Sequence, residues 1–245
     1  MNKLILCEGK TDAILLSYYL GKTAGWKFVK KGPSGLAIQQ PNDNESISWY
    51  EKDDDYLLIC GVGGKDNFGN FFDERIRIPL VTTNAFEKIA IITDRDDREV
   101  SAICTSLAED MSGFFTDIQD REWCENSYRD AFGMEKTVQL LMVVIPKEHL
   151  GALENVMLSA ISEDPYDKNI VDKTAVFVQQ MRMEADKYIS TERLQLKAHL
   201  GVTWAVQFPE KVFSMIDEQI NSVRWEEYDT LKECFGILNV VPHIK

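Results

Sequence analysis

The 245-residue sequence has no long apolar run, and no stretch of about 18 residues is hydrophobic enough to span a membrane. The first apolar run covers only residues 4–7 before Glu8 interrupts it, so no signal peptide is predicted. Hydrophobic residues make up 44% and charged residues 27% of the chain, which is typical of a globular protein and excludes a disordered or fibrous one. We therefore expect no contact with a membrane.

The sequence also lacks closely spaced pairs of cysteines. Its five cysteines are odd in number, scattered along the chain, and never spaced as C-x-x-C. This argues against a disulfide framework and against a cysteine-rich zinc site. The pattern is typical of reduced thiols, so a cytoplasmic location is expected.

Basic residues are scarce, with 27 Lys and Arg against 40 Asp and Glu, a formal net charge of −13. Such a charge disfavours a protein that coats nucleic acid non-specifically. The charge is uneven, however, since residues 1–40 hold six lysines against Glu8 and Asp12. These lysines can meet phosphate, or can simply lie on a solvated helix end and strand edge.

Short apolar segments alternate with amphipathic ones over the first 148 residues. Strands are predicted at 3–7, 26–30, 56–60, 88–93 and 138–145, with helices at 12–20, 66–78 and 97–112. A loop or an inserted hairpin is expected at 113–135. This alternation predicts an α/β fold with a mainly parallel, Rossmann-like sheet flanked by helices.

After Pro146 the apolar residues follow a helical period. Helices are predicted at 151–163, 168–188, 191–199, 209–221 and 227–236. We therefore expect two regions, an α/β domain at 1–148 and a helical C-terminal region at 149–245 that packs on it.

Chemically useful residues follow three of the predicted strands, where ligands gather in open α/β sheets. These residues are Glu8, Lys10 and Asp12, then Gly63, Gly64 and Lys65, and finally Asp94 and Asp96. Asp94 and Asp96 can point the same way from an extended strand end. Two negative charges at such a short distance repel each other and usually need a cation or a shared proton between them. Carboxylate oxygens are hard ligands, which suit Mg²⁺ or Mn²⁺. Taken singly, an acidic strand end is more often merely solvated.

Taken in order, the three segments resemble the TOPRIM domain of topoisomerases, bacterial primases, RecR-type proteins, maturation ribonucleases and OLD-family nucleases. The motifs on which this resemblance rests are Glu-Gly-Lys-Thr-Asp at 8–12, Gly-Gly-Lys at 63–65 and Thr-Asp-Arg-Asp-Asp at 93–97. The resemblance covers residues 3–145. It matches the family's glutamate to Glu8 and its Asp-x-Asp to Asp94 and Asp96.

The resemblance to OLD-type members adds Asp12, four residues after the glutamate, and an acid beyond the last core strand, for which Glu154 is the candidate. It implies phosphodiester chemistry with one or two Mg²⁺ or Mn²⁺ ions held by Glu8, Asp12, Asp94, Asp96 and Glu154. Lys65 and Lys10 would neutralise phosphate, and Gly63 and Gly64 would let the backbone approach it.

The sequence lacks features of larger TOPRIM proteins, and this narrows the kinds of TOPRIM protein that it can resemble. The sequence has no room for a breakage domain with a tyrosine nucleophile, and no G-x-x-x-x-G-K-[ST] loop of the ATPase fused in OLD proteins. What remains resembles the stand-alone OLD-like proteins. This implies a nuclease acting on DNA or RNA, a separately encoded ATPase as partner, and a role in phage defence or nucleic-acid processing. Separately, the acidic C-terminal tail can dock a basic partner or hold the protein as a homodimer.

Two other functions remain open. The net charge of −13 favours a non-catalytic TOPRIM-fold binding or regulatory subunit that works with an ATPase, whereas the presence of every core acid favours the nuclease. A phosphatase with an aspartate nucleophile at Asp94-x-Asp96 is disfavoured, because that motif normally opens its sheet and here a strand carrying Glu8 comes first.

Overall fold

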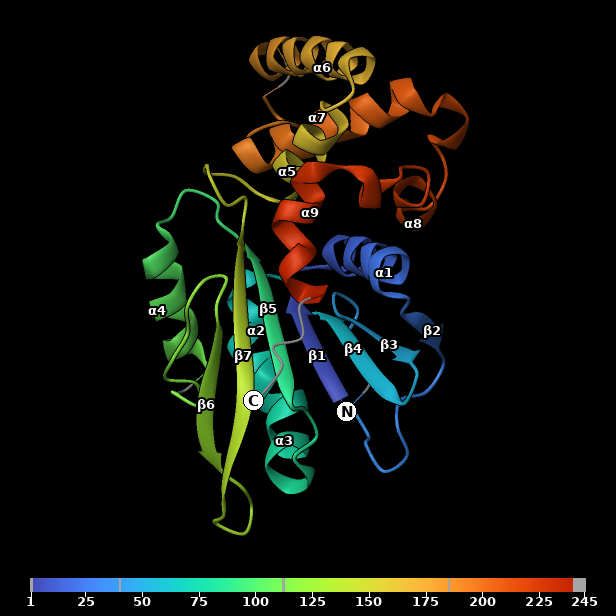
Figure 1. Cartoon of the computed structure of the whole chain (residues 1–245). Coiled ribbons are helices and arrows are strands. Elements are labelled where there is room, and N and C mark those ends of the chain that lie inside the picture. Colours follow the sequence, from blue (N-terminus) through green and yellow to red (C-terminus); the bar gives the residue numbers. More distant parts are fainter. Residues whose placement is uncertain (1, 40, 112, 185, 240–245) are drawn as a thin grey trace.

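The computed structural model describes residues 2–39, 41–111, 113–184 and 186–239. Its centre is a seven-stranded sheet in the order β2-β3-β4-β1-β5-β7-β6, flanked by helices on both faces (Figure 1). The strands are β1 (Asn2–Cys7), β2 (Lys27–Val29), β3 (Ser46–Lys52), β4 (Asp55–Gly61), β5 (Lys88–Asp94), β6 (Trp123–Arg129) and β7 (Glu135–Ile145). The expected α/β class is confirmed.

The four central strands β4, β1, β5 and β7 are parallel, while β2, β3 and β6 pair antiparallel at the two edges. Every residue of β5 is buried, as expected of a strand covered on both faces. Cys7 at the end of β1 lies opposite Ile92 of β5. The residues that follow these two strands therefore meet at one edge of the sheet.

Helices from different parts of the chain cover the two faces. The helices are α1 (Lys10–Ala24), α2 (Phe68–Phe71), α3 (Arg77–Thr83), α4 (Val100–Asp110), α5 (Leu153–Ile161), α6 (Pro165–Glu184), α7 (Glu192–Gln207), α8 (Ile216–Ile220) and α9 (Asp229–Phe235). The core on one face joins α1 to the C-terminal helices, and the core on the other face contains α2, α3 and α4. None of the helices in the described ranges is long and apolar enough to cross a bilayer.

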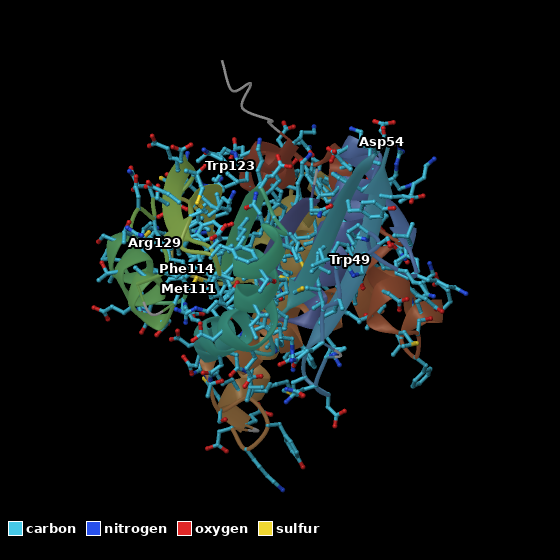
Figure 2. All side chains as sticks on the ribbon, turned by 90° about the horizontal axis from the view of Figure 1, so that it is seen from below. Trp49, Asp54, Met111, Phe114, Trp123 and Arg129 are labelled. Carbon is cyan, nitrogen blue, oxygen red and sulfur yellow. The ribbon has the colours of Figure 1, made fainter. Side chains whose placement is uncertain are left out.

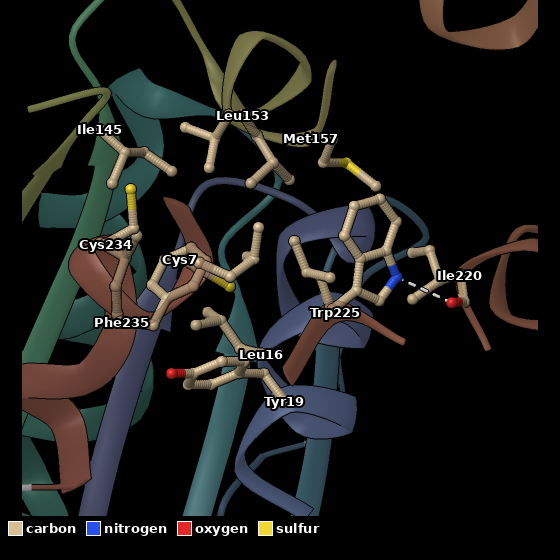
Figure 3. Packing of buried hydrophobic residues seen from close by; sticks show 14 of the residues in the cluster. Cys7, Leu16, Tyr19, Ile145, Leu153, Met157, Ile220, Trp225, Cys234 and Phe235 are labelled. Atoms are coloured by element: carbon tan, nitrogen blue, oxygen red, sulfur yellow. Dashed lines mark hydrogen bonds between the residues drawn. The ribbon is translucent and has the colours of Figure 1, made fainter. Parts of the chain in front are cut away.

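The C-terminal helices share their core with the sheet. Trp225 is fully buried and donates a hydrogen bond from Nε1 to the Ile220 carbonyl at 2.8 Å (Figure 3). Phe235 of α9 meets Tyr19 of α1 edge to face, with ring centroids 5.8 Å apart. Because aromatic side chains bury a large apolar area, these contacts tie residues beyond 149 to the α/β core.

Some predicted elements differ from the observed ones. The helix predicted at 66–78 is present within a continuous helical segment at residues 65–83, but this segment contains a π-helical stretch at Phe72–Ile76 between α2 and α3 and extends past Ile78. The predicted helix at 209–221 is reduced to a 3₁₀ turn at Pro209–Lys211 and to α8. Residues 113–135 were expected to form a loop or an inserted hairpin, and the structure shows one strand there, β6, which pairs antiparallel with the core strand β7.

Helix α7 is longer than predicted, because it continues through Gly201 to Gln207. A glycine inside a helix costs about 1 kcal/mol relative to alanine. The buried side chains Leu200, Thr203 and Trp204 on either side of Gly201 supply the packing that offsets this cost. The helix begins at Thr191, whose side chain accepts a hydrogen bond from the Leu194 amide at 3.2 Å.

Candidate functional site

Two buried carboxylates lie side by side where β1 and β5 end. Glu8 is 2% exposed and Asp94 is 3% exposed. Glu8 Oε1 accepts hydrogen bonds from Thr93 Oγ1 at 2.7 Å and from the Asp94 amide at 2.8 Å. Since Thr93 and Asp94 belong to the neighbouring parallel strand, the glutamate is held in place by β5.

The second oxygen of Glu8 has a different environment. Glu8 Oε2 is buried without a hydrogen-bond partner among the described residues, and Arg193 Nη2 lies 3.6 Å from it. The same Arg193 nitrogen lies 3.7 Å from Asp94 Oδ2, while Asp94 Oδ1 accepts a hydrogen bond from the Leu153 amide at 2.9 Å. Both distances to Arg193 exceed a normal hydrogen bond, so the guanidinium acts on the two acids through its charge.

Four of the five predicted metal-ligating acids share one cavity. This cavity of about 360 Å³ lies at the carboxyl edge of the sheet. Its lining includes the acids Glu8, Asp12, Asp94 and Glu154, the cations Lys10, Arg193 and Lys197, and the glycines Gly63 and Gly64. The structure thus brings together residues separated by almost 190 positions in the sequence, from Glu8 to Lys197.

Burial and mutual repulsion perturb these acids. Loss of solvent, followed by the charge of Glu8, raises the pKa of Asp12 from 3.8 to about 7. The same two causes, with further repulsion from Asp12 and Glu154, raise the pKa of Asp94 well above its usual range. Excess negative charge in a poorly solvated cavity favours bound protons or a cation.

A ready-made metal site is not formed by the side chains as they stand. Across residues 2–39, 41–111, 113–184 and 186–239, no group of three or more His, Cys, Asp or Glu side chains converges as ligands. Among the described residues of this cavity, Arg193 is the cation that contacts both Glu8 and Asp94.

Asp96, the fifth predicted ligand, lies outside the acidic cavity. Strand β5 ends at Asp94, and Asp96 adopts a left-handed backbone with φ of 53°. This conformation breaks the extended period from which Asp94 and Asp96 were expected to point the same way. Lys65 Nζ donates to Asp96 Oδ2 at 2.8 Å and to the Asp94 carbonyl at 2.6 Å. Lys65 therefore ties the two aspartates together through the backbone of one and the side chain of the other.

The glycine loop after β4 crosses over Glu8. The Gly64 amide donates to the Glu8 carbonyl oxygen at 2.8 Å, and Gly63 has φ of 85°, a backbone conformation that favours glycine. The Gly64 amide is thus engaged with β1 and is not free for an anion. Lys10 at the start of α1 donates to the Asp43 carbonyl.

Arg193 and Lys197 were not found by the sequence reasoning. They are four residues apart on α7, and both line the acidic cavity. The spacing Arg-x-x-x-Lys within the helix predicted at 191–199 places two cations on one helical face, which is the signal that was present. The orientation of this face toward Glu8 is set by the packing of α7, which the sequence of the helix alone does not reveal.

A second cavity of about 720 Å³ adjoins the acidic one and shares Arg193 with it. It lies among residues of α5, α6 and α7, and its polar lining includes Asp96, Asn155, Arg182 and His199. His199 shares a hydrogen bond of 2.9 Å between its Nε2 atom and the Val171 carbonyl. Because the two cavities share Arg193, a ligand can extend from the acids into the space between α5, α6 and α7.

Fold and site define an α/β protein whose parallel sheet gathers buried acids and helix-borne cations at its carboxyl edge. Residues 2–231 match the family described as Protein of unknown function (DUF3226), and the chain belongs to this family. A similar solved structure is hypothetical protein PH0156 from Pyrococcus horikoshii OT3. It is 15% identical, with a TM-score of 0.45 over 92% of this chain and 98% of that one. No curated protein matches the sequence.

The perturbed acids predict that the metal-free protein loses stability as the pH rises. Between pH 3.8 and about 7, Asp12 keeps a proton in the folded state but loses it in the unfolded chain. Folding then takes up a proton, so the free energy of unfolding falls with rising pH, and Asp94 acts in the same direction at higher pH.

Thermal unfolding in EDTA at about pH 5 and pH 7 tests this prediction. Between about pH 5 and pH 7, the melting temperature of wild type should fall by at least about 3 °C more than that of Asp12→Asn, because asparagine cannot titrate. Equal losses in the two proteins would show that the cavity does not perturb Asp12.

Proposed function

We propose that the protein is a Mg²⁺- or Mn²⁺-dependent nuclease of the TOPRIM type, similar to stand-alone OLD-like proteins, that cleaves phosphodiester bonds of DNA or RNA. The observation that supports this most strongly is the pair Glu8 and Asp94. Both are buried at the ends of adjacent strands, and Glu8 Oε2 lacks a hydrogen-bond partner in the part of the chain that the structure describes. A desolvated carboxylate oxygen without a donor is costly, and a cation removes that cost.

The acids fit a divalent cation by their chemistry. Glu8, Asp94, Asp12 and Glu154 line one cavity and offer hard oxygen ligands, and Asp96 lies at the adjoining cavity. A bound ion would supply Lewis-acid stabilisation of charge that develops on the phosphate.

The protein's own residues have separate roles in this proposal. Lys10, Arg193 and Lys197 place positive charge beside the acids, where they can bind and orient a phosphate. In the metal-free cavity, burial and the charge of Glu8 raise the pKa of Asp12 to about 7, so binding of a cation there would release a proton. The neighbouring cavity provides room for the nucleotide next to the reacting phosphate.

Arg193 would have to leave the two acids when a metal binds. We therefore predict that Arg193→Met binds Mn²⁺ about tenfold more tightly than wild type, because one competing cation is lost. The same variant should cleave more slowly, because the phosphate loses a guanidinium. Calorimetric Mn²⁺ titration measures the first effect and a cleavage assay the second. Unchanged affinity would contradict the competition.

A non-catalytic TOPRIM-fold subunit is the second candidate. It is favoured by the contact of Arg193 with both acids and by the lack of three converging ligands in the described part of the chain. In that case the acids would be held by Arg193, and activity would depend on a separately encoded ATPase. The cytoplasmic setting is expected from the unpaired cysteines, the homodimer from the acidic C-terminal tail and the role in phage defence from the resemblance, and all three are part of the same proposal.

A nicking assay separates the two candidates. Supercoiled plasmid, linear DNA and a structured RNA are incubated with Mg²⁺ or Mn²⁺, with Asp94→Asn as the matched control. Cleavage by wild type alone supports the nuclease and identifies the preferred polymer. Mn²⁺ binding without cleavage, lost in Asp94→Asn, indicates a site that waits for a partner. Neither binding nor cleavage favours the regulatory subunit.

A further inference from the structure

A third cavity, separate from the acidic cavity and its neighbour, lies at the opposite end of the sheet. Its volume is about 240 Å³, and its lining includes the first residues of β1, β4 and β5, the end of α1, and Trp26 and Trp123. Figure 2 views the molecule from this end and labels Trp123. The acidic cavity lies at the carboxyl ends of the same strands, so the two cavities share no lining residue.

Two hydrogen-bond donors of residues that line this cavity have no acceptor among the described residues. Lys88 is 6% exposed, and within residues 2–39, 41–111, 113–184 and 186–239 neither its Nζ nor the Trp123 Nε1 has a hydrogen-bond partner. Lys88 Nζ lies 5.4 Å from the centroid of the Trp123 ring, which stabilises the charge but accepts none of its three N–H groups in the usual way. Buried donors normally have acceptors, so an acceptor is what this site lacks.

The side-chain period of the strands directs Lys88 to this cavity. Lys88 shares a face of β5 with Ala90, and Lys3 shares a face of β1 with Ile5, on the side of the sheet that α1 covers. Lys3 is already paired with Asp55 at 3.3 Å, whereas Lys88 has no ion pair among the described residues. Burial and the charge of Lys3 lower the pKa of Lys88. A bound anion would oppose this effect.

We infer that this cavity binds a small aromatic monocarboxylate. Lys88 is a buried cation of this wall without an acidic partner among the described residues, so a ligand with one negative charge suits it. The indoles and the aliphatic side chains Leu20 and Leu57 give the remaining wall an apolar character. The volume equals that of about eight water molecules, which suits one substituted ring. Because Nζ is covered in the ligand-free protein, binding would require a rotation of the flexible Lys88 side chain that directs Nζ toward the carboxylate.

Calorimetry and tryptophan fluorescence with benzoate test this inference, with neutral benzamide as the matched ligand. Wild type should bind benzoate with a Kd at or below about 1 mM and bind benzamide at least about tenfold more weakly. Lys88→Met should reduce benzoate affinity about tenfold or more and should fold at least as stably, because it removes a buried ammonium without an acceptor. Lys31→Met, which alters an exposed lysine outside the cavity, should bind as wild type does.

Trp123→Phe keeps the ring and removes the N–H, so it provides a second variant that should weaken benzoate binding. Equal binding of benzoate and benzamide would overturn the inference, as would full affinity in Lys88→Met or no binding at about 10 mM. Tighter binding of phenyl phosphate than of benzoate would overturn the carboxylate assignment. None of these results depends on whether the protein cleaves nucleic acid.

Discussion

Replacing Asp94 by asparagine is expected to lower metal-dependent cleavage by about 1000-fold or more, and Glu8→Gln should do the same. Each substitution removes a buried negative charge at the point where β1 and β5 meet. Asparagine still offers Oδ1 to the Leu153 amide, and glutamine still offers Oε1 to Thr93 and Asp94. The variants therefore lose charge while the local hydrogen bonds are kept.

The assay is the initial rate of plasmid or RNA cleavage in Mg²⁺ and Mn²⁺. Glu109→Gln is the control, because Glu109 is exposed on α4, on the other face of the sheet. Asp94→Asn should also raise the melting temperature of the metal-free protein, since burial and neighbouring acids disfavour the ionised carboxylate there. Cleavage by Asp94→Asn at the wild-type rate would refute this site, whatever the fold contributes.

Trp225→Ala is expected to destabilise the protein by about 3–5 kcal/mol, as large-to-small changes in packed cores do. Trp225 is fully buried, and its ring centroid lies 6.5 Å from that of Trp204 and 6.1 Å from that of Tyr228. The same hydrophobic cluster contains Leu16 of α1 (Figure 3). Removing the indole would leave a cavity between the C-terminal region and the α/β core.

Urea unfolding measures this effect. Phe213→Ala is the control, because the side chain of Phe213 is fully exposed and its loss should change the free energy of unfolding by less than about 0.5 kcal/mol. A loss below about 1 kcal/mol for Trp225→Ala would show that the C-terminal helices do not unfold together with the sheet.

Several parts of the fold follow from local sequence. The strands β1, β4, β5 and β7 correspond to apolar runs, because a strand in the middle of a parallel sheet is buried on both faces. The positions of Glu8 and Asp94 follow as well, since each stands directly at the end of such a run. The break between the 3₁₀ turn at Pro209–Lys211 and α8 was not predicted from the sequence, and neither was the π-helical stretch at Phe72–Ile76 inside the helical segment 65–83.

The amino-acid pattern alone was enough to predict the α/β class, the strand ends that carry the acids, and the change to helices after Pro146. Each of these depends on hydrophobic periodicity, which is a local property of the chain. Three features depend on contacts between distant segments. The first is the approach of Arg193 to Glu8 and Asp94, and the second is the left-handed backbone at Asp96 that lets its side chain pair with Lys65. The third is the presence of two donors without acceptors among the described residues, Lys88 and Trp123, beside one cavity. Such contacts are set by how helices and strands pack in space, and the periodicity of a single segment carries no information about its neighbours.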